Sequence, residues 1–390
     1  MPDRDWMLHV AHAALEVSQA DQTEVLVSVH REGLTRFANN VIHQNVAESS
    51  VSISMRAVIG KRIGVAATND PSVQSVRDLA QRATELARLA APSDDFVSLP
   101  GPSELSARCQ VDPALATVEF GPEERAAAVK EIITLARGSG LRAAGQVMTG
   151  RTAYAVTNSL GIEAQWEQSH ARARVVMQGS DSSGFAEAEA ADVRAIPFET
   201  LARTAVDKAV RSAEPVDLAP GRYTVILEPL AVSDMLTMLA VYDLHALAHQ
   251  EGRSFTSGRM GEKVCGDNVS IWDDGCDPRG MPLPNDFEGV PRQRVELIRD
   301  GVLVGVTYDS FTAGREPGAR NTGHALPAPN TWGPIPQNLF MKAGDYSLEE
   351  MIRATERGVL VTRFHYTNMV HPVRTVFTGM TRDGTFLIEG

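Results

Sequence analysis

Two stretches of the chain repeat one order of sequence patterns, and this repeat limits the fold more than any other feature. The shared order is a strand, a turn with asparagine, a long alternating strand, a glycine turn, a short strand and a helix. The first copy covers residues 35–91 and the second covers residues 152–213. Strands that alternate apolar and polar residues are typical of antiparallel sheets with one buried face. The order fits a structural duplication or two unrelated meanders, and the sequence alone leaves both open.

The patterns predict an α+β protein with two regions. We expect an N-terminal α/β-type domain of antiparallel strands and helices over residues 1–215, and a β-rich domain over residues 216–390. Residues 92–122 contain five prolines and little periodicity, so they are interpreted as a connection within the first domain. The spacing of apolar residues predicts one helix over 123–137 and one long helix over 229–249.

Three further local signals are specific enough to test. Helical spacing predicts a first helix over residues 8–20. Two apolar runs joined at Asp300–Gly301 predict a β-hairpin, because an Asp-Gly pair accepts the left-handed backbone of a tight turn. Ser347 and Glu350 have the spacing of a capping box at the start of a short helix.

Charge and composition exclude several classes of protein. The 390 residues carry 37 Lys and Arg against 49 Asp and Glu, a net charge of −12, which disfavours a nucleic-acid binder or a protein of acidic membrane surfaces. No apolar run is long enough to span a membrane. The acidic start Met1–Asp5 does not resemble a signal peptide. Three scattered cysteines do not suggest a disulfide framework, and we therefore expect a cytoplasmic protein.

Two histidines form the first candidate site. His245 and His249 are four residues apart in a predicted helix, the spacing with which helical metalloproteases hold zinc. A hydrolytic zinc site also needs a general base, usually a glutamate directly after the first histidine, and Ala246 occupies that position. The preferred alternative is that both histidines lie at the polar end of a helix and interact with its dipole.

Polar loops supply the remaining candidates. Glu251 and Arg253 open a glycine-rich loop after the predicted helix, and Asn321 and His324 lie in a second polar loop. Such loops often carry binding residues, so we expect a cleft near residues 245–262 that includes these side chains. The chain contains no dinucleotide-binding glycine motif, no P-loop and no serine nucleophile elbow. The catalytic residues are therefore unassigned.

Motifs along nearly the whole chain resemble the TldD/PmbA family, also described as modulators of DNA gyrase. Each motif is weak by itself, and together, in this order, they are fairly specific. They are Arg36–Asn40, the Gly60–Gly64 turn, Glu251–Phe255, Ser257–Glu262, Asp286–Pro291, Leu297–Leu303, Asn321–Ala325 and Asp383–Gly390.

The resemblance implies a zinc metallopeptidase system that processes or degrades small or unfolded peptides, built from two related subunits. The TldD-type subunit carries a His-Glu-x-x-x-His helix and a cysteine ligand, and the TldE-type subunit lacks them. Here the histidines are four apart instead of five, and no cysteine matches the ligand. We therefore expect a TldE-like subunit that binds no cofactor itself, with zinc in a TldD-like partner.

Other interpretations stay open at this point. The chain could itself bind zinc at His245 and His249 and act as a peptidase, with a displaced acid such as Glu251 activating the water. It could instead be a non-catalytic regulatory protein. The dimer could be a heterodimer or pair the chain with itself. We expect the chain to bind a peptide substrate, and we expect no binding to nucleic acid or to membranes. The strand that stops at Gly390 suggests either a truncated C-terminal domain or a variation within the family, and the sequence leaves both open.

Overall fold

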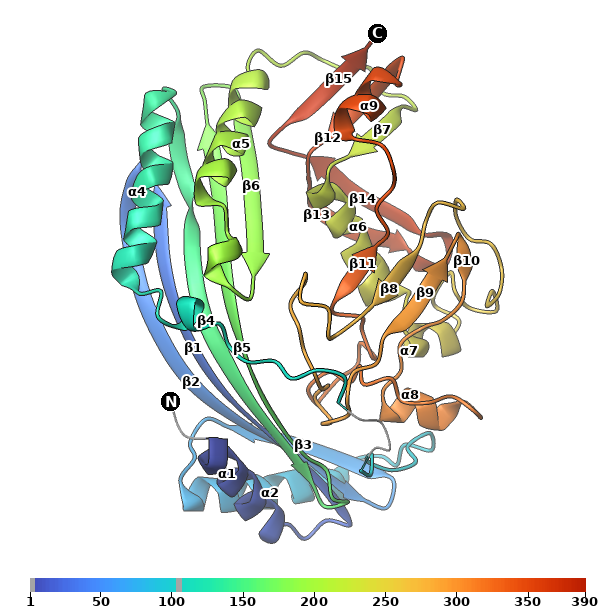
Figure 1. Cartoon of the computed structure of the whole chain (residues 1–390). Helices are drawn as coiled ribbons and strands as arrows, with labels where there is room; N and C mark the ends of the chain where they lie inside the picture. The colour runs from blue at the N-terminus through green and yellow to red at the C-terminus, as the bar shows by residue number, and fades with distance from the viewer. Residues whose placement is uncertain (1–3, 103–106) are drawn as a thin grey trace.

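A computed structural model describes residues 4–102 and 107–390 of the chain, and its largest element is a six-stranded antiparallel sheet (Figure 1). The long central strands bend together along the height of the molecule. Across the sheet the order is β3 (Arg62–Thr68), β2 (Val41–Ile59), β1 (Gln22–Ala38), β4 (Arg142–Asn158), β5 (Glu163–Gln178) and β6 (Ser183–Ala190).

The two halves of the sheet are built in the same order, so the repeat in the sequence corresponds to a structural repeat. Each half is a three-stranded antiparallel meander followed by a helix, and the halves meet where β1 pairs with β4. β1 and β2 are joined at Asn39 and Asn40, which both have positive φ angles (50° and 61°). Asparagine tolerates this backbone in a two-residue hairpin turn. The alternation of Thr23–Val29 predicts a strand there, and β1 includes it and continues to Ala38. β1 starts at Gln22 and β4 at Arg142, so both strands begin before residues 35 and 152, where the repeat starts.

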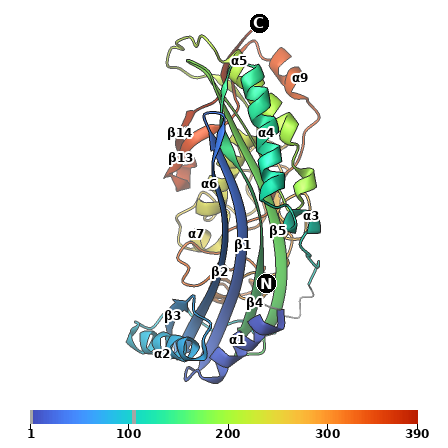
Figure 2. The ribbon, with the colours of Figure 1, turned by 90° about the vertical axis from the view of Figure 1, so that its left-hand side faces the viewer.

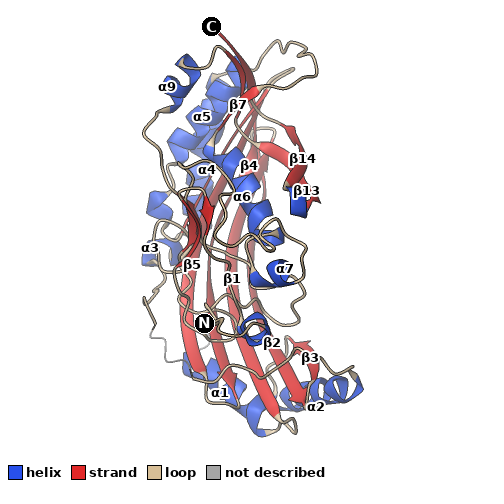
Figure 3. Cartoon of the chain, turned by 90° about the vertical axis from the view of Figure 1, so that its right-hand side faces the viewer, coloured by secondary structure: helices blue, strands red, loops and turns tan. Residues whose placement is uncertain are grey.

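Four long helices cover one face of this sheet. They are α1 (Arg4–Glu16), α2 (Val73–Leu89), α4 (Pro122–Gly138) and α5 (Phe198–Arg211), with the short α3 (Leu115–Val118) and the 3₁₀ turn η1 (Val193–Ala195) beside them. Figure 3 shows α1 and α2 at the lower end of the sheet and α4 and α5 at its upper end. The predicted helix over 123–137 is confirmed as α4, and the predicted helix over 8–20 starts and ends earlier, as α1.

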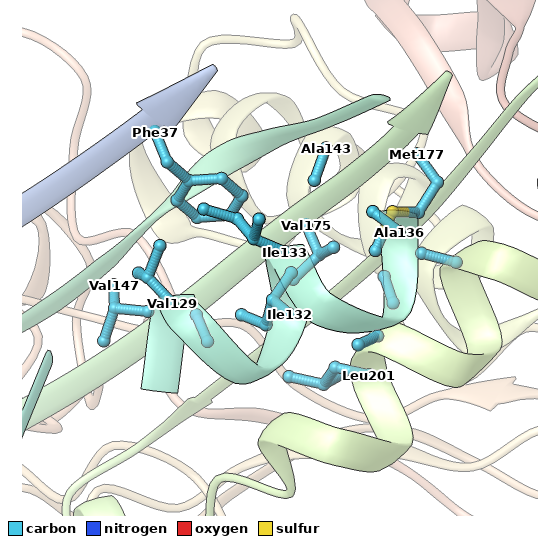
Figure 4. Close-up of a cluster of buried hydrophobic side chains, with 14 of the residues drawn as sticks. Phe37, Val129, Ile132, Ile133, Ala136, Ala143, Val147, Val175, Met177 and Leu201 are labelled. Carbon is cyan, nitrogen blue, oxygen red and sulfur yellow. The ribbon is translucent and has the colours of Figure 1, made fainter. Parts of the chain in front are cut away.

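Alternation along the strands decides which residues these helices bury. Odd-numbered residues of β1, such as Val25, Val27 and Phe37, point toward the helices and are fully buried. Figure 4 shows Ile132 of α4 and Leu201 of α5 packed together over Val175 of β5. Each such side chain contributes about 2 kcal/mol through the area it removes from water, so the helices are held mainly by this face.

The C-terminal region packs against the opposite face of the sheet. Trp166 and Tyr154, which point away from the helices, stack with each other and contact Phe287 of the C-terminal region. The region begins with β7 (Thr224–Leu227), α6 (Pro229–Tyr242) and α7 (Ala246–Gln250). It continues with β8 (Ile271–Asp273), β9 (Val295–Arg299), β10 (Val302–Leu303), α8 (Ser310–Arg315), β11 (Leu339–Met341), α9 (Leu348–Arg353), β12 (Arg357–Val361), β13 (Phe364–His371), η2 (Pro372–Arg374), β14 (Val376–Thr381) and β15 (Thr385–Glu389).

Short strands form three small sheets in this region. Their orders are β10-β9-β8-β11, β15-β12-β7 and the pair β13-β14. The hairpin predicted at Asp300–Gly301 is confirmed between β9 and β10, and the capping box predicted at Ser347 and Glu350 starts α9. The molecule is therefore the α+β protein that the sequence predicts.

Two expectations from the sequence are wrong. The helix predicted over 229–249 ends at Tyr242, and α7 starts separately after a break. Cys109 and Cys276 form a disulfide across 167 residues of sequence, although the cysteine count gave no reason to expect one. The bond ties the connection after residue 106 to the turn that follows β8.

Some expectations fall outside the described residues. They are the acidic start at residues 1–3 and residues 103–106 of the predicted connection. Among the helices of the described residues, none has the length and apolar character needed to cross a membrane.

Candidate functional site

A cavity of about 640 Å³ lies between the sheet and the C-terminal region, and it is the best candidate for a binding site. β2, β3 and the end of α2 form one wall, while α7, α8 and the loop 325–333 form the other. Most of the wall is apolar, and its charged residues are Arg56, Glu288 and Asp309. The apolar residues are Ile63, Val65, Leu86, Leu89, Phe96, Leu247, Phe311, Leu326 and Pro329.

A buried cluster of charges joins the sheet to the C-terminal region beside this cavity. Nη2 of Arg56 donates to Oε2 of Glu24 at 2.6 Å and to Oε1 of Glu288 at 2.8 Å. Burial raises the pKa of Glu24 to about 7, and repulsion from Glu288 adds to this effect while Arg56 opposes it. Glu24 is therefore a carboxyl group that titrates near neutral pH inside the protein.

Two more carboxyl groups lie next to Glu288. Asp309 caps α8 by accepting from the backbone N–H of Thr312 at 2.8 Å. Asp286 accepts backbone hydrogen bonds from Val290 at 2.8 Å and from Ala325 at 2.9 Å. Burial, reinforced by repulsion from Glu288, raises the pKa of both aspartates. Glu24, Asp286 and Asp309 therefore hold their protons more tightly than isolated acids do.

The structure separates the two histidines that the sequence places on one helix face. His245 lies before α7 rather than in a helix, with φ −136° and ψ 154°, and it forms a bridge to Thr307. Its Nδ1 accepts from the N–H of Ala248 at 3.4 Å, and its Nε2 bonds to the carbonyl oxygen of Val241 at 3.0 Å. Burial lowers the pKa of His245 to about 4, so the imidazole is neutral at pH 7.

The zinc that the resemblance implies can be tested against this geometry. Both ring nitrogens of His245 are engaged by backbone groups, and Nδ1 of His249 bonds to Oγ1 of Thr256 at 3.1 Å. In residues 4–102 and 107–390, no group of three or more His, Cys, Asp and Glu side chains is placed to hold a metal ion. As placed, His245 and His249 do not form a zinc-ligand set.

The other residues predicted from the sequence are not gathered into one cleft. Glu251 and Arg253 form an ion pair of 2.6 Å with each other at the surface. His324 is fully buried, and its Nε2 bonds to Oδ1 of Asp273 at 2.9 Å. Asn321 uses its side-chain oxygen to accept from the N–H of Gly323 at 2.8 Å. None of these four side chains lines the cavity of about 640 Å³, although Ala325 and Leu326, directly after His324, do.

The environment of His324 explains its burial. Burial would raise the pKa of Asp273, but His324 and Arg292 outweigh it and hold that pKa well below its ordinary value. Arg292 lies 3.1 Å from the same carboxylate, and the backbone N–H groups of Gln337 and Asn338 donate to its other oxygen. This network joins β8 to the loops 321–324 and 337–338, so it stabilises the small sheet.

Sequence reasoning missed the buried charges at and beside the cavity. Glu24 and Arg56 lie inside alternating strands, where a charged residue is ordinarily solvent-exposed. Glu288 belongs to the Asp286–Pro291 motif that carried the family resemblance, and this motif was the one available signal. The 32 and 232 residues that separate Arg56 from its two partners give no local pattern.

The outer edge of β2 is the second feature with binding capacity. β1 pairs with β2 along its length, whereas β3 pairs only with Ile53–Ile59, so among the described residues the side of Val41–Ser52 that faces away from β1 has no neighbouring strand. Figure 2 shows β3 beside the lower end of β2 alone. This stretch is largely exposed and contains one charged residue, Glu48. Unpaired N–H and C=O groups along such an edge can pair with an added strand.

Family models match two parts of the chain. The PmbA/TldA metallopeptidase C-terminal domain matches residues 220–390, and PmbA/TldA metallopeptidase domain 1 matches residues 23–87. Together the two matches cover more than half of the chain.

Curated relatives and a solved structure agree with these matches. A metalloprotease TldD homolog of Haemophilus influenzae is 30% identical over 183 residues, which are 46% of this chain and 37% of the relative. A metalloprotease of Methanothermobacter thermautotrophicus is 29% identical over 174 residues, 42% of this chain and 36% of the relative. The matches thus span little more than a third of each relative's length. The crystal structure of TldE from Thermococcus kodakarensis has a TM-score of 0.85 at 22% identity, covering 98% of this chain and 88% of that one.

Proposed function

The chain belongs to the PmbA/TldD metallopeptidase family, and from this premise we propose that it is the peptide-binding, non-zinc subunit of a metallopeptidase assembly. The observation that carries the proposal is the position of His245. This imidazole caps α7 with one nitrogen and bonds to a backbone carbonyl with the other, so it has no lone pair directed at a metal. Catalytic zinc would then come from a partner of the same family that carries the His-Glu-x-x-x-His helix.

Two features support binding of extended peptides. The open edge of β2 at Val41–Ser52 offers backbone donors and acceptors over 12 residues, flanked by small or neutral side chains. Backbone pairing at a sheet edge recognises a peptide largely independently of its sequence. The apolar cavity of about 640 Å³ could take side chains of the same or another peptide segment. The substrates would be small or unfolded peptides, in the cytoplasm, with a TldD-like subunit or a second copy of this chain as partner.

The first experiment is zinc analysis combined with a peptidase assay. The purified chain, prepared without chelator, is expected to contain far less than one zinc per chain and to be inactive alone. Adding the family member that carries the zinc motif should produce zinc-dependent cleavage of an unstructured peptide. Stoichiometric zinc that is lost in His245→Ala or His249→Ala would instead identify an independent peptidase. Binding of the partner with unchanged cleavage would favour a regulatory protein.

A second experiment tests the β2 edge directly. Successive backbone N–H groups of a strand point to opposite sides, so only one of Ser49→Pro and Ser50→Pro removes an outward donor and leaves the β1–β2 ladder intact. Of the two proline variants, the one that unfolds at the same temperature as the native chain is the one that keeps the β1–β2 ladder. Its affinity for an extended peptide should fall at least about tenfold, the effect of losing a hydrogen bond and blocking the edge. The same peptide with alternate amides N-methylated provides the matched ligand control.

A further inference from the structure

Three arginines surround a cavity of about 420 Å³ on the face of the sheet that carries the helices. Arg31 of β1 and Arg151 of β4 come from the sheet, and Arg125 comes from the first turns of α4. The cavity also includes Ser49 and Thr149. It lies on the side of the sheet away from the C-terminal region, where Figure 1 shows α4, so it is separate from the cavity described above.

Arg125 is a buried cation without a carboxylate partner in the described part of the chain. Its side chain is only 4% exposed. Its Nη1 donates to the carbonyl oxygen of Phe120 at 2.9 Å and to Oγ1 of Thr149 at 3.0 Å, and its Nε donates to Oγ1 of Thr35 at 3.3 Å. All of these acceptors are neutral. A buried charge that lacks a counter-charge is costly, so the arrangement favours a bound anion.

The position of the Arg125 guanidinium depends on Gly33. A β-carbon at residue 33 would lie 2.5 Å from Nη1 of Arg125, so the guanidinium occupies the space that any other residue would fill. No hydrogen bond to Nη2 of Arg125 is found within residues 4–102 and 107–390. Nη2 is not one of the fully buried side-chain atoms that lack a hydrogen-bond partner, so solvent or a ligand can reach it. Arg125 therefore has a donor group available to a molecule in the cavity.

The two sheet arginines strengthen the positive charge. Arg31 and Arg151 are directly opposite each other on β1 and β4, a cross-strand arrangement in which like charges repel. Arg151 pairs with Glu167 at 3.1 Å, whereas Arg31 is exposed and has no ion pair among the described residues. An anion between them would relieve the repulsion.

Nearby acids do not neutralise this cavity. Glu32 and Glu48 also line the cavity, but strand alternation places their side chains on the opposite face of the sheet from Arg31, and Glu32 lies 3.4 Å from His170 there. The carboxylate of Glu124 accepts from the N–H of Gly121 at 2.9 Å at the start of α4. Burial lowers the pKa of Arg125, and the charge of Glu124 offsets that effect only in part. The remaining carboxylate, Glu167, already has Arg151 as its partner.

We propose that Arg31, Arg125 and Arg151 form a binding site for an oxyanion, a carboxylate or a phosphate group. Guanidinium groups bind both anions through paired N–H donors, and these charge-assisted bonds are stronger than bonds between neutral groups. The hydroxyl group of Ser49 provides a further polar contact at the wall, while the hydroxyl of Thr149 accepts from Arg125 and donates to the carbonyl oxygen of Phe120. This site does not depend on the peptidase proposal, because it lies on the other face of the sheet.

Isothermal titration of the whole chain with inorganic phosphate, and separately with acetate, tests the site. We expect saturable binding of at least one anion with one site per chain. Arg31→Gln should weaken that binding at least about tenfold, because it removes a charge-assisted hydrogen bond from an exposed residue without disturbing the core. Lys130→Gln, which removes an exposed charge from the same helix α4, is the matched control and should leave binding unchanged.

The two anions distinguish the sources of the ligand. Binding of acetate but not phosphate would identify a carboxylate site, such as one for a peptide C-terminus, and the reverse would identify a phosphate site. Arg125→Lys keeps the charge but loses the planar fork, and it should weaken binding while its thermal unfolding shows that the chain is folded. The proposal is overturned if neither anion binds at millimolar concentration, or if Arg31→Gln and Lys130→Gln have equal effects.

Discussion

The buried carboxyl group of Glu24 should make the protein less stable as the pH rises toward neutrality. Burial raises its pKa from 4.5 to about 7 in the folded chain. An acid with a raised pKa holds its proton in the folded state after the unfolded chain has released it. The folded state is therefore favoured most below pH 4.5, and this contribution is lost as the pH rises through the window from 4.5 to about 7.

The size of the effect follows from the shift. The shift from 4.5 to about 7 corresponds to roughly 3 kcal/mol over the whole window, and most of it, about 2–3 kcal/mol, falls between pH 5 and pH 8. Glu24→Gln removes the titration and keeps a side chain of similar shape that can accept from Arg56. The free energy of unfolding of the variant, relative to the native chain, should therefore rise by about 2–3 kcal/mol from pH 5 to pH 8.

Urea unfolding of both proteins at pH 5 and pH 8 measures this difference. Glu85→Gln is the matched control, because it removes a carboxylate from an exposed position on α2. Asp286 and Asp309 contribute slopes of the same sign in every protein, so they largely cancel in the comparison. A difference between Glu24→Gln and the native chain that stays constant within about 0.5 kcal/mol at the two pH values would refute the reasoning.

Three further predictions concern local structure. His245→Ala should lower the free energy of unfolding by about 1–2 kcal/mol in urea, because α7 loses its cap, and should leave the zinc content unchanged; a loss of bound zinc would contradict this. Gly64→Ala should cost about 1–3 kcal/mol or more by thermal unfolding, since the new β-carbon would lie 2.2 Å from the backbone of α2. Gly344→Ala, with open space around it, is the control, and equal effects would disprove the contact. Cys109→Ser should cost about 2–5 kcal/mol by losing the bond to Cys276, and a reducing agent should destabilise the native chain but not the variant.

Local sequence patterns predicted the elements whose causes are local. Alternation in β1 and β2, the Asp300–Gly301 turn and the Ser347 capping box depend on neighbours within a few residues, and the structure contains all of them. The same applies to α4, which begins at Pro122 and extends to Gly138. The repeated order of strands and helices is also present in the two halves of the large sheet, although the sequence left open whether they form one structure.

The break before α7 shows where local patterns fail. Residues 229–249 have helical spacing throughout, yet the helix ends at Tyr242 because Leu244 is buried in the C-terminal core and His245 pairs with Thr307. Those contacts come from a segment about 60 residues away in sequence. Helical periodicity is a weak preference that tertiary contacts override, and the expected pair of histidines on one helix face disappears with the break.

The sequence by itself determined the strands, most helices, the tight turns and the family resemblance, because each rests on neighbouring residues or on short motifs. Only the tertiary structure decided which charges meet. Arg56 lies between Glu24 and Glu288, Cys109 meets Cys276, and Arg125 reaches the space left by Gly33. These groups interact because folding removes water around them, and burial changes their pKa values and their need for partners. No spacing along the chain encodes such encounters, which is why the candidate sites became visible only in three dimensions.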